Sequence, residues 1–446
     1  MTGRPPRLAP LAVALLVGAT LLGLGATAHA SGITLGRYGG MFGHPNADRG
    51  LALYWNPARL GLHPGRFVTI DSTLVRRDAS YDRVIFPDNP YYDQPGVLET
   101  NVGLATTSTM AVLPYGAGGA AWELDEVNIG FALGAYPMYG GSAGWDKNPQ
   151  APDAYPGGLD GPQRWSGINS TFLILHYTGA FGITLTEWGL SFGFGISYAD
   201  GTIATTRARN VNRSESLLDE RGFIQEGRVY FEGDDHALSM HYGVSYDSDT
   251  VTASAVYRSG YNLDIRGDLY QAYGSQPPVQ VRAFLDFPTP HVFQTAFTLR
   301  FGNVEMTGMT DYSAWSRMEA NNIFVEKDPP DLLLEIPRNL RDTFSLRGMM
   351  GGNVGRHHRW HIAGMLGYDM SAVPEETIDA ALSDAAKIQV GIGARGTIGE
   401  HLGLLTSYQY DIWSPVEADN SIHEPTANGI YRDSRHWVNL SLEGRF

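Results

Sequence analysis

Hydrophobic and polar residues alternate along most of this chain, and the last ten residues show the pattern clearly. Val438 and Leu440 lie on one face of an extended segment, Asn439 and Ser441 lie on the other, and the chain ends on Phe446. The side chains of a β-strand point alternately to opposite faces. A final strand that is apolar on one face, polar on the other and closed by an aromatic residue is typical of an outer-membrane β-barrel.

Alternating or glycine-rich aromatic stretches occur fourteen times in the chain. An even number of strands allows both ends to lie on one side of the membrane, as in bacterial single-chain barrels. The sequence therefore predicts an all-β, antiparallel transmembrane barrel of about fourteen strands. The predicted strands cover 66–78, 100–113, 126–139, 167–181, 187–207, 228–246, 250–266, 280–301, 303–319, 340–354, 358–370, 386–398, 401–414 and 434–446.

The connections support this count, because those after even-numbered strands are mostly short and those after odd-numbered strands are long. The long ones carry most of the Pro, Asp and Asn, which suits exposed loops. The turn around 115–125 is the least regular of the short ones, and 375–386 reads as a short amphipathic helix on a loop. We therefore expect short periplasmic turns at one end of the barrel and long external loops at the other.

The period of two also assigns the faces of each strand. In 386–398, Ile388 and Val390 point one way, whereas Lys387 and Gln389 point the other, into the lumen. An interior that carries charges is wet, and its charges need partners. The same period places further charged side chains inside the barrel, namely Asp71, Arg258, Glu305, Asp311, Arg347, Asp369, Asp411, Glu443 and Arg445.

The amino-terminal residues resemble an export signal. Arg4 and Arg7 precede an apolar run at 11–25, which is followed by Ala-His-Ala at 28–30. This arrangement is that of a secretory signal peptide over residues 1–30. No later stretch reaches the roughly 20 consecutive apolar residues that a membrane-spanning helix needs, so a membrane role would fall to strands.

Composition narrows the possible functions further. The 54 Gly, 23 Tyr and 9 Trp are what curved strands and interfacial aromatic belts use. The net charge of −15 argues against a nucleic-acid partner. The chain has no Cys, which rules out thiol catalysis, disulfides and cysteine metal sites.

Residues 31–65 do not fit a strand. They lie between the predicted signal peptide and the first predicted strand and carry Trp and Leu residues that need burial. An unplugged barrel of this size would leave an aqueous hole, and such barrels often hold a folded segment in the lumen. We therefore predict a hatch, or plug, at 31–65 inside a barrel formed by 66–446.

The hatch also carries a resemblance to a known family. Residues 53–60 read Leu-Tyr-Trp-Asn-Pro-Ala-Arg-Leu and follow a Gly-Arg-x-Gly-Gly run at 36–40. This stretch resembles the Asn-Pro-Ala hatch motif of the FadL-type outer-membrane transporters of long-chain fatty acids and aromatic hydrocarbons. Segments 290–315 and 340–355, and the final strand, also resemble the carboxyl-terminal half of that family, so the likeness covers nearly the whole mature chain.

The resemblance implies passive uptake of hydrophobic molecules across the bacterial outer membrane. It implies capture of the solute between external loops, binding in the lumen, and release after the hatch moves, sideways through an opening in the wall. From the residues we also expect a protein that is not an enzyme, has no cofactor or metal, and contacts outer-membrane lipid and lipopolysaccharide as a monomer. The sequence does not decide the substrate, or whether release is lateral or periplasmic.

Candidate functional residues fall into four groups, each with a structural alternative. The hatch motif of Asn56, Pro57 and Ala58 is a candidate for gating, and the alternative is a static turn. Lumen arginines could bind a carboxylate through bidentate hydrogen bonds, and the alternative is pairing with lumen acids. The candidates are Arg258, Arg300, Arg347 and Arg395.

The other two groups lie in the first half of the barrel. Loop 140–166 is aromatic enough for a capture groove or for interfacial anchoring, and its candidates are Trp145, Tyr155, Leu159 and Trp165. In strand 126–139 Gly130, Gly134 and Pro137 could mark a kink and a lateral opening, because Gly and Pro weaken ladder pairing. The alternative for these glycines is ordinary barrel curvature.

Two other function classes are alternatives to transport. A general diffusion porin would lack a folded plug, which 31–65 contradicts. An outer-membrane lipase or protease would need Ser, His and Asp together, and the strand histidines His176 and His241 have no associated nucleophile motif. The cluster of His357, His358 and His361 is better explained as a solvated turn than as a zinc site.

Overall fold

The computed structural model describes residues 37–85, 97–148, 156–210, 212, 214–216, 219–223, 225–274, 277–355 and 359–446. The predicted signal peptide at 1–30 lies outside the described residues, and so do 31–36 of the predicted hatch. His357 and His358 of the histidine cluster, and Tyr155 of the predicted capture loop, also lie outside them.

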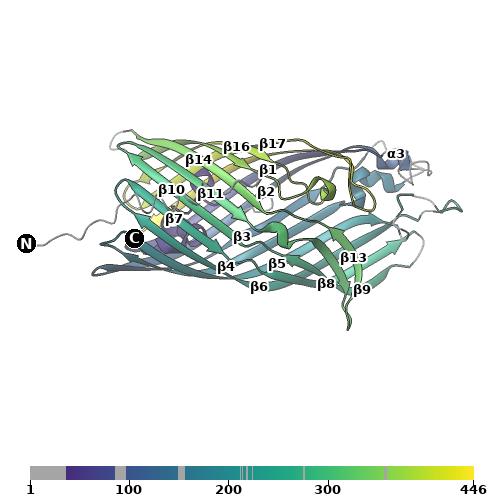
Figure 1. Ribbon diagram of the computed structural model, residues 1–446, viewed down its shortest axis with the longest axis horizontal. Helices are drawn as coiled ribbons and strands as arrows, with labels where there is room; N and C mark the ends of the chain where they lie inside the picture. Colours follow the sequence, from purple (N-terminus) through teal and green to yellow (C-terminus); the bar gives the residue numbers. More distant parts are fainter. Residues whose placement is uncertain are drawn as a thin grey trace, which may run out of the picture.

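The strands form one closed antiparallel barrel of 14 strands, which confirms the predicted fold class. The barrel is elongated, and the carboxyl terminus lies at one of its ends (Figure 1). It closes where β1 pairs with β19 along their whole lengths, from Phe67 opposite Arg445 to Arg83 opposite Gly429. The first six strands are β1 Gly65–Arg83, β2 Gly103–Leu124, β3 Val127–Gly144, β4 Asn169–Leu185, β5 Leu190–Arg209 and β6 Gly227–Asp247.

Several later strands of the barrel are interrupted, so that two segments follow one another across the wall. Each pair of segments hydrogen-bonds to the same neighbouring strands, as when β6 pairs first with β7 and then with β8. Pro290 falls in one interruption, where the missing amide hydrogen removes a ladder bond. The segments are β7 Val251–Arg258 with β8 Asn262–Tyr273, β9 Val279–Pro288 with β10 Val292–Phe301, β11 Val304–Ser313 with β12 Ala320–Val325, β13 Asp331–Pro337 with β14 Thr343–Val354, and β17 Leu402–Trp413 with β18 Val416–Ala418.

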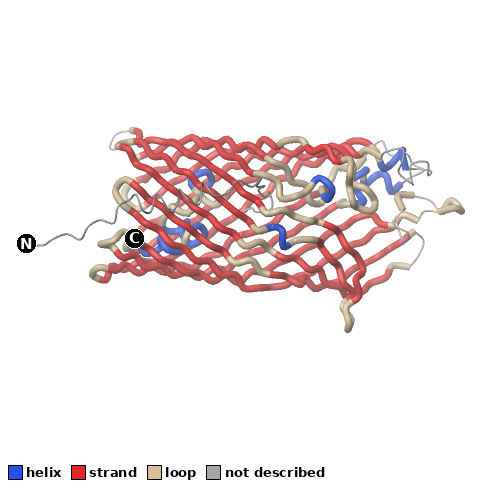
Figure 2. The backbone as a smooth tube through the Cα atoms, viewed as in Figure 1, coloured by secondary structure: helices blue, strands red, loops and turns tan. Residues whose placement is uncertain are grey.

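The barrel is completed by β15 Trp360–Asp369, β16 Lys387–Ile398 and β19 Gly429–Arg445. Short helices of the described residues lie inside the barrel or among the loops at the end away from the carboxyl terminus (Figure 2). No helix in the described part of the chain is long and apolar enough to cross a membrane.

Some predicted boundaries were wrong. The irregular turn predicted at 115–125 is part of β2, and the real turn is tight, with Asp125 in the left-handed region at φ 54°. Much of the predicted loops 267–279 and 320–339 is strand, which extends the barrel beyond the predicted strands. The predicted strands end too early, at Gly, Pro and Asn residues that the ladder tolerates near the barrel rim.

The helix predicted at 375–386 was also wrong. Only Glu375–Thr377 is helical, as a single 3₁₀ turn, and the rest is an irregular loop. This loop is not exposed, because Ala372, Ile378 and Ala380 are fully buried. It folds inward and contributes to the lumen wall described below.

The two faces of the wall follow the predicted alternation. Ile392 and Leu440 are 61% and 49% exposed on the outer surface, as the lipid-facing side chains of a membrane barrel should be. Asp71, Gln389 and Asp411 are buried on the inner surface. Some of these inner polar groups have protein partners, as when Asp71 accepts from the Gly39 amide and Asp411 accepts from the Trp437 side chain, both at 2.9 Å.

Candidate functional site

Residues 37–64 lie inside the barrel at the same end as the carboxyl terminus (Figure 1). They form four short helices, η1 Gly40–Phe42, η2 Arg49–Leu51, α2 Ala52–Trp55 and η3 Pro57–Gly61. Asn56 caps η3, because its side-chain oxygen accepts a hydrogen bond from the Ala58 amide at 3.1 Å. Its side-chain amide donates to the Pro45 carbonyl at 3.1 Å and to the Val244 carbonyl of β6 at 3.4 Å. We refer to residues 37–64 as the hatch.

A row of four glycines in the wall receives the hatch motif. Gly130 of β3 pairs with Gly182 of β4, which pairs with Gly193 of β5, which pairs with Gly243 of β6. A Cβ atom at Gly193 would lie 2.1 Å from the Ala58 nitrogen, and a Cβ at Gly130 or Gly182 would also meet hatch backbone. The glycines therefore allow close backbone approach and seat residues 56–60 against the wall.

An ion-pair cluster ties the hatch to the end of β6 and the short turn after it. Arg59 is 2% exposed, pairs with Asp247 at 2.7 Å and donates to the Ser245 hydroxyl at 2.7 Å. Its guanidinium also pairs with Asp48 of the hatch. Burial, together with the nearby positive charges of Arg395 and Arg59, lowers the pKa of His44 to about 3, so this hatch imidazole is neutral at neutral pH.

On its other side, the hatch forms hydrogen bonds and ion pairs with strands near the place where β1 and β19 close the barrel. Asp71 of β1 accepts hydrogen bonds from the Gly39 amide and from the Asn439 side chain of β19, both at 2.9 Å. Arg37 pairs with Asp369 at 3.2 Å and with Asp411 at 3.6 Å. The hatch is thus held around the circumference of the lumen and blocks this end of the barrel.

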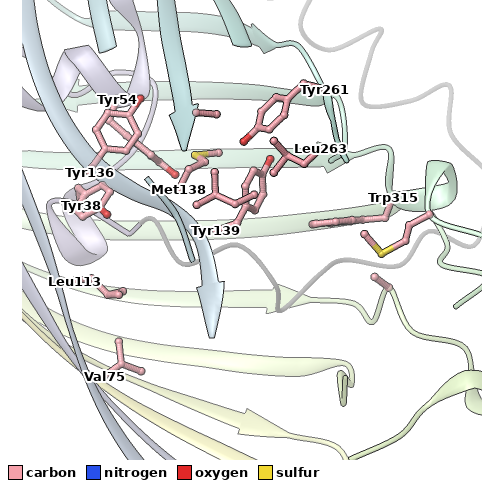
Figure 3. Packing of buried hydrophobic residues seen from close by; sticks show 14 of the residues in the cluster. Tyr38, Tyr54, Val75, Leu113, Tyr136, Met138, Tyr139, Tyr261, Leu263 and Trp315 are labelled. Atoms are coloured by element: carbon pink, nitrogen blue, oxygen red, sulfur yellow. The ribbon is translucent and has the colours of Figure 1, made fainter. Parts of the chain in front are cut away.

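Buried aromatic side chains join the hatch to β3 (Figure 3). Tyr38 and Tyr54 of the hatch pack against Tyr136 of β3, with ring centroids 5.7 and 5.0 Å away. The Tyr38 hydroxyl donates to the Pro137 carbonyl at 2.6 Å. Further along β3, Tyr139 packs edge-on against Trp315 at 6.0 Å, which carries the cluster deeper into the lumen.

The ladder between β2 and β3 stops halfway along the wall. The two strands pair from Leu124 opposite Val127 to Gly116 opposite Ala135, and no pairing follows between 103–115 and 136–144. β3 instead has a register shift against β4 between Pro137 and Tyr139. The strands meet again near the loops, where the Thr107 hydroxyl donates to the Gly144 carbonyl at 2.6 Å. We call this unpaired stretch, 108–115 and 136–143, the wall gap.

A lumen cavity of about 270 Å³ reaches the wall gap. Thr109 and Ala111 of β2 and Gly140–Ala143 of β3 line it on the side of the gap. The rest of its lining comes from strands around the barrel and from the inward loop, at Ala381–Ser383. Most of the lining is apolar and includes Val75, Phe172, Ile203, Phe231, Phe287 and Trp437. We call it the lumen chamber.

A second cavity of about 390 Å³ lies among the external loops. Its apolar lining includes Leu332, Leu334 and Ile336 of β13, which pairs with β12 on one side only. Its polar lining includes His423 and Arg209. We call it the outer cavity.

The four arginines predicted to bind a carboxylate in the lumen do not line the lumen chamber. Arg258 donates to the Tyr54 carbonyl at 2.6 Å, and Arg347 lies 3.9 Å from Asp311, both beside a polar pocket of about 60 Å³ against the hatch. Arg300 and Arg395 both pair with Glu305, at 3.6 and 2.6 Å. Carboxylate binding by these arginines stays a prediction.

The predicted capture-loop residues are mostly buried. Trp145 and Trp165 are 8% and 5% exposed, and Leu159 is 49% exposed. Trp165 lines the outer cavity and donates to the Asn101 side chain at 2.9 Å.

The three residues predicted to mark a kink have different surroundings in the structure. Only Pro137 lies at the register shift of β3. Gly130 belongs to the glycine row, and a Cβ at Gly134 would lie 2.5 Å from the hatch side chain of Leu53. These two glycines therefore allow the hatch to pack closely against the wall.

Sequence reasoning missed the glycine row and the inward loop. Both left a signal. Gly182, Gly193 and Gly243 occupy inward phases of three successive strands, and 378–386 is rich in small apolar residues for a supposedly exposed loop.

Solved structures with the same architecture are known. A Pseudomonas aeruginosa FadL homologue superposes with a TM-score of 0.75 at 16% identity, covering 94% of this chain and 100% of that one. The chain has the FadL-type fold. The P. putida toluene transporter TodX matches with a TM-score of 0.64 at 15% identity over 89% of this chain and 94% of its own. The Ralstonia pickettii toluene transporter TbuX matches with 0.58 at 14% identity over the same shares.

At such identities the likeness to the FadL-type structures concerns the fold. No family profile matches the sequence, and no curated protein matches it. The roles of the hatch, the lumen chamber and the wall gap therefore depend on the residues of this chain.

The glycine row predicts that a side chain there unseats the hatch. Gly193→Val would drive methyl groups into the backbone of residues 57–58, so we expect the hatch to detach and the barrel to conduct ions. The measurement is single-channel conductance in planar bilayers. Gly308→Val is the matched control, since a Cβ at Gly308 of β11 meets no atom within 4 Å. Equal conductance of both variants and the parent would contradict the role of the row.

Loss of Arg59 should loosen the same hatch. Arg59→Met leaves Asp247 without its cation, which costs about 3 kcal/mol for a buried pair. We expect faster protease cleavage within residues 37–64 and intermittent conductance. Arg76→Met is the control, because Arg76 is 57% exposed, its pair with Asp78 lies outside the lumen, and such pairs contribute little. Identical cleavage of both variants would show that the cluster does not hold the hatch.

Proposed function

We propose that this protein carries small hydrophobic molecules passively across the bacterial outer membrane. The observation that supports the proposal most strongly is an apolar lumen chamber whose wall is interrupted between β2 and β3. Concave, mostly apolar cavities with a few polar groups are the usual binding sites for small molecules. The fold shared with a FadL homologue and with two toluene transporters agrees with such a cargo.

Entry is assigned to the outer cavity. It lies among the external loops and presents leucine and isoleucine side chains of β13, so an apolar solute that has left water can be held there. The lumen chamber lies next, and Ile336 lines both spaces. A solute would therefore pass from the outer cavity to the lumen chamber along one apolar surface.

Exit is assigned to the wall gap. The hatch blocks the lumen towards the periplasm with buried ion pairs and backbone contacts, so leaving by that route requires breaking them. The wall gap needs no such rupture, because its strands are already unpaired. It also delivers an apolar solute to lipid and avoids water, which is the favourable direction of transfer.

The porin alternative agrees less well with the structure. A diffusion pore needs a continuous aqueous path, whereas here residues 37–64 occupy the lumen and are mostly buried. An enzyme is not favoured either, because His176 contacts the Tyr261 hydroxyl and lies among tyrosines, with no serine nucleophile beside it among its hydrogen-bond partners.

Filling the wall gap should stop transport without unfolding the barrel. Gly141 lines the lumen chamber, and a Cβ there would meet no atom within 4 Å, so Gly141→Trp can be accommodated and would occupy the gap. We expect uptake of radiolabelled oleate and of toluene to fall to the level of cells without the protein. Gly308→Trp, on the opposite part of the wall, should leave uptake as in the parent.

Three outcomes of the uptake and conductance measurements distinguish the possible functions. Loss of uptake with Gly141→Trp and a non-conducting parent supports transport through the wall gap. Unchanged uptake places the exit elsewhere. A parent that conducts ions freely and imports neither compound is a porin, and the proposed function is then wrong.

A further inference from the structure

β13, which lines the outer cavity, is a strand with one free edge. It runs from Asp331 to Pro337 at the end of the barrel away from the carboxyl terminus and pairs with β12 along one side (Figure 1). Within the described residues, 332–336 form no backbone–backbone hydrogen bond outside this pairing. Successive residues of an antiparallel strand direct their backbone groups to alternate edges, so about three residues present an N–H and a C=O away from β12.

The outer cavity lies along this free edge. Its lining includes every residue from Leu332 to Pro337. The side chains of a strand alternate between two faces, so a cavity over one face would contact only every second residue. A cavity on the side of β12 would be lined by Ala320–Val325, and none of these residues lines it. The unpaired backbone edge therefore faces a space of about 390 Å³.

The composition of the free edge suits pairing with a further strand. Natural proteins protect the edges of their sheets with charged side chains, prolines or very short strands. Here residues 332–336 read Leu-Leu-Leu-Glu-Ile, with a single charge, and the prolines stand outside them at 329, 330 and 337. Leu332 is 53% exposed. The centre of β13 thus lacks the usual protection against another strand.

The surroundings of the edge select a single extended chain as the partner. Other segments enclose the cavity, so the edge of a folded sheet from a second barrel has no room beside β13, whereas one strand needs a spacing of only about 4.8 Å. An extended peptide also offers backbone donors and acceptors that match those of β13, which an apolar solute lacks. The enclosing segments are Trp165–Ser166, Arg207–Asn210, Asp379 and Ile422–Pro425.

We propose that the free edge of β13 binds an extended peptide segment of a polypeptide outside the cell, which adds a strand to the barrel within the outer cavity. Backbone hydrogen bonds to β13 hold the segment, and Leu332, Leu334 and Ile336 contact its apolar side chains. The inference goes beyond the proposed function, because the peptide is recognised by its backbone and stays among the external loops. It requires no transport of any solute.

The test uses the full-length protein in detergent micelles and two fluorescein-labelled octapeptides of alternating threonine and valine. One peptide is unmodified. The other is N-methylated at its four central residues, which removes amide donors from both of its edges and keeps its side chains. We expect the methylated peptide to bind at least about tenfold more weakly by fluorescence anisotropy, because backbone hydrogen bonds are lost. The unmodified peptide should also slow amide hydrogen exchange at 331–337.

Leu332→Glu is the variant that changes the site, and Val279→Glu is its matched control. Both side chains are 53% exposed, but only Leu332 lines the outer cavity. We expect Leu332→Glu to weaken binding of the unmodified peptide about tenfold through loss of apolar contact. Val279→Glu should bind the peptide as the parent does. Retention of the heat-resistant gel mobility of a folded barrel shows that each variant is assembled.

Three results would overturn the inference. Equal binding of the two peptides by the parent would show that the cavity recognises side chains alone. Absence of binding, or unchanged hydrogen exchange at 331–337, would show that the edge is not the site. Exchange there that slows with rising protein concentration in the absence of peptide would assign the edge to a second copy of this chain. No transported solute enters these measurements, so the proposed function is tested separately.

Discussion

A membrane barrel must pair the backbone amides and carbonyls of its wall, because lipid offers them no partner. Here the ladder closes from β1 through β19, and interrupted strands such as β7 and β8 still share neighbours, so pairing continues across their breaks. A long stretch departs from this rule, between 103–115 of β2 and 136–144 of β3. The hatch and the aromatic cluster contact this stretch at Tyr136 and Pro137, and the lumen chamber reaches it at Gly140–Ala143.

Two carbonyls of β3, one in the wall gap and one at its end, accept hydrogen bonds from side chains. The Pro137 carbonyl accepts from the Tyr38 hydroxyl of the hatch, and the Gly144 carbonyl accepts from the Thr107 hydroxyl. Buried carbonyls without partners are costly, so these contacts stabilise a strand that has lost one neighbour. The lumen chamber lies behind the unpaired segment and is lined mostly by apolar side chains, which offer water few hydrogen-bond partners.

The sequence predicted the barrel, its strand number and its faces because a period of two is a local property that each strand carries by itself. The hatch was predicted from one segment that broke this period. The site was harder, since it depends on register. Gly130 and Gly193 look like ordinary curvature until the ladder aligns them against Leu60 and Ala58 of the hatch. Neither motif nor spacing reveals that Arg258 donates to the Tyr54 carbonyl of the hatch.

The same hatch that lies in the end of the barrel near the carboxyl terminus also contacts the edge of the wall gap. Residues 56–60 are seated in the glycine row, whereas Tyr38 reaches the register shift of β3 from the other end of the hatch. Movement of the first hatch turn would withdraw the Tyr38 hydroxyl from Pro137 and its ring from Tyr136, with no need to break the seat at Gly193. The hatch therefore contacts the wall gap and the glycine row through different residues, so that the two contacts are structurally separate.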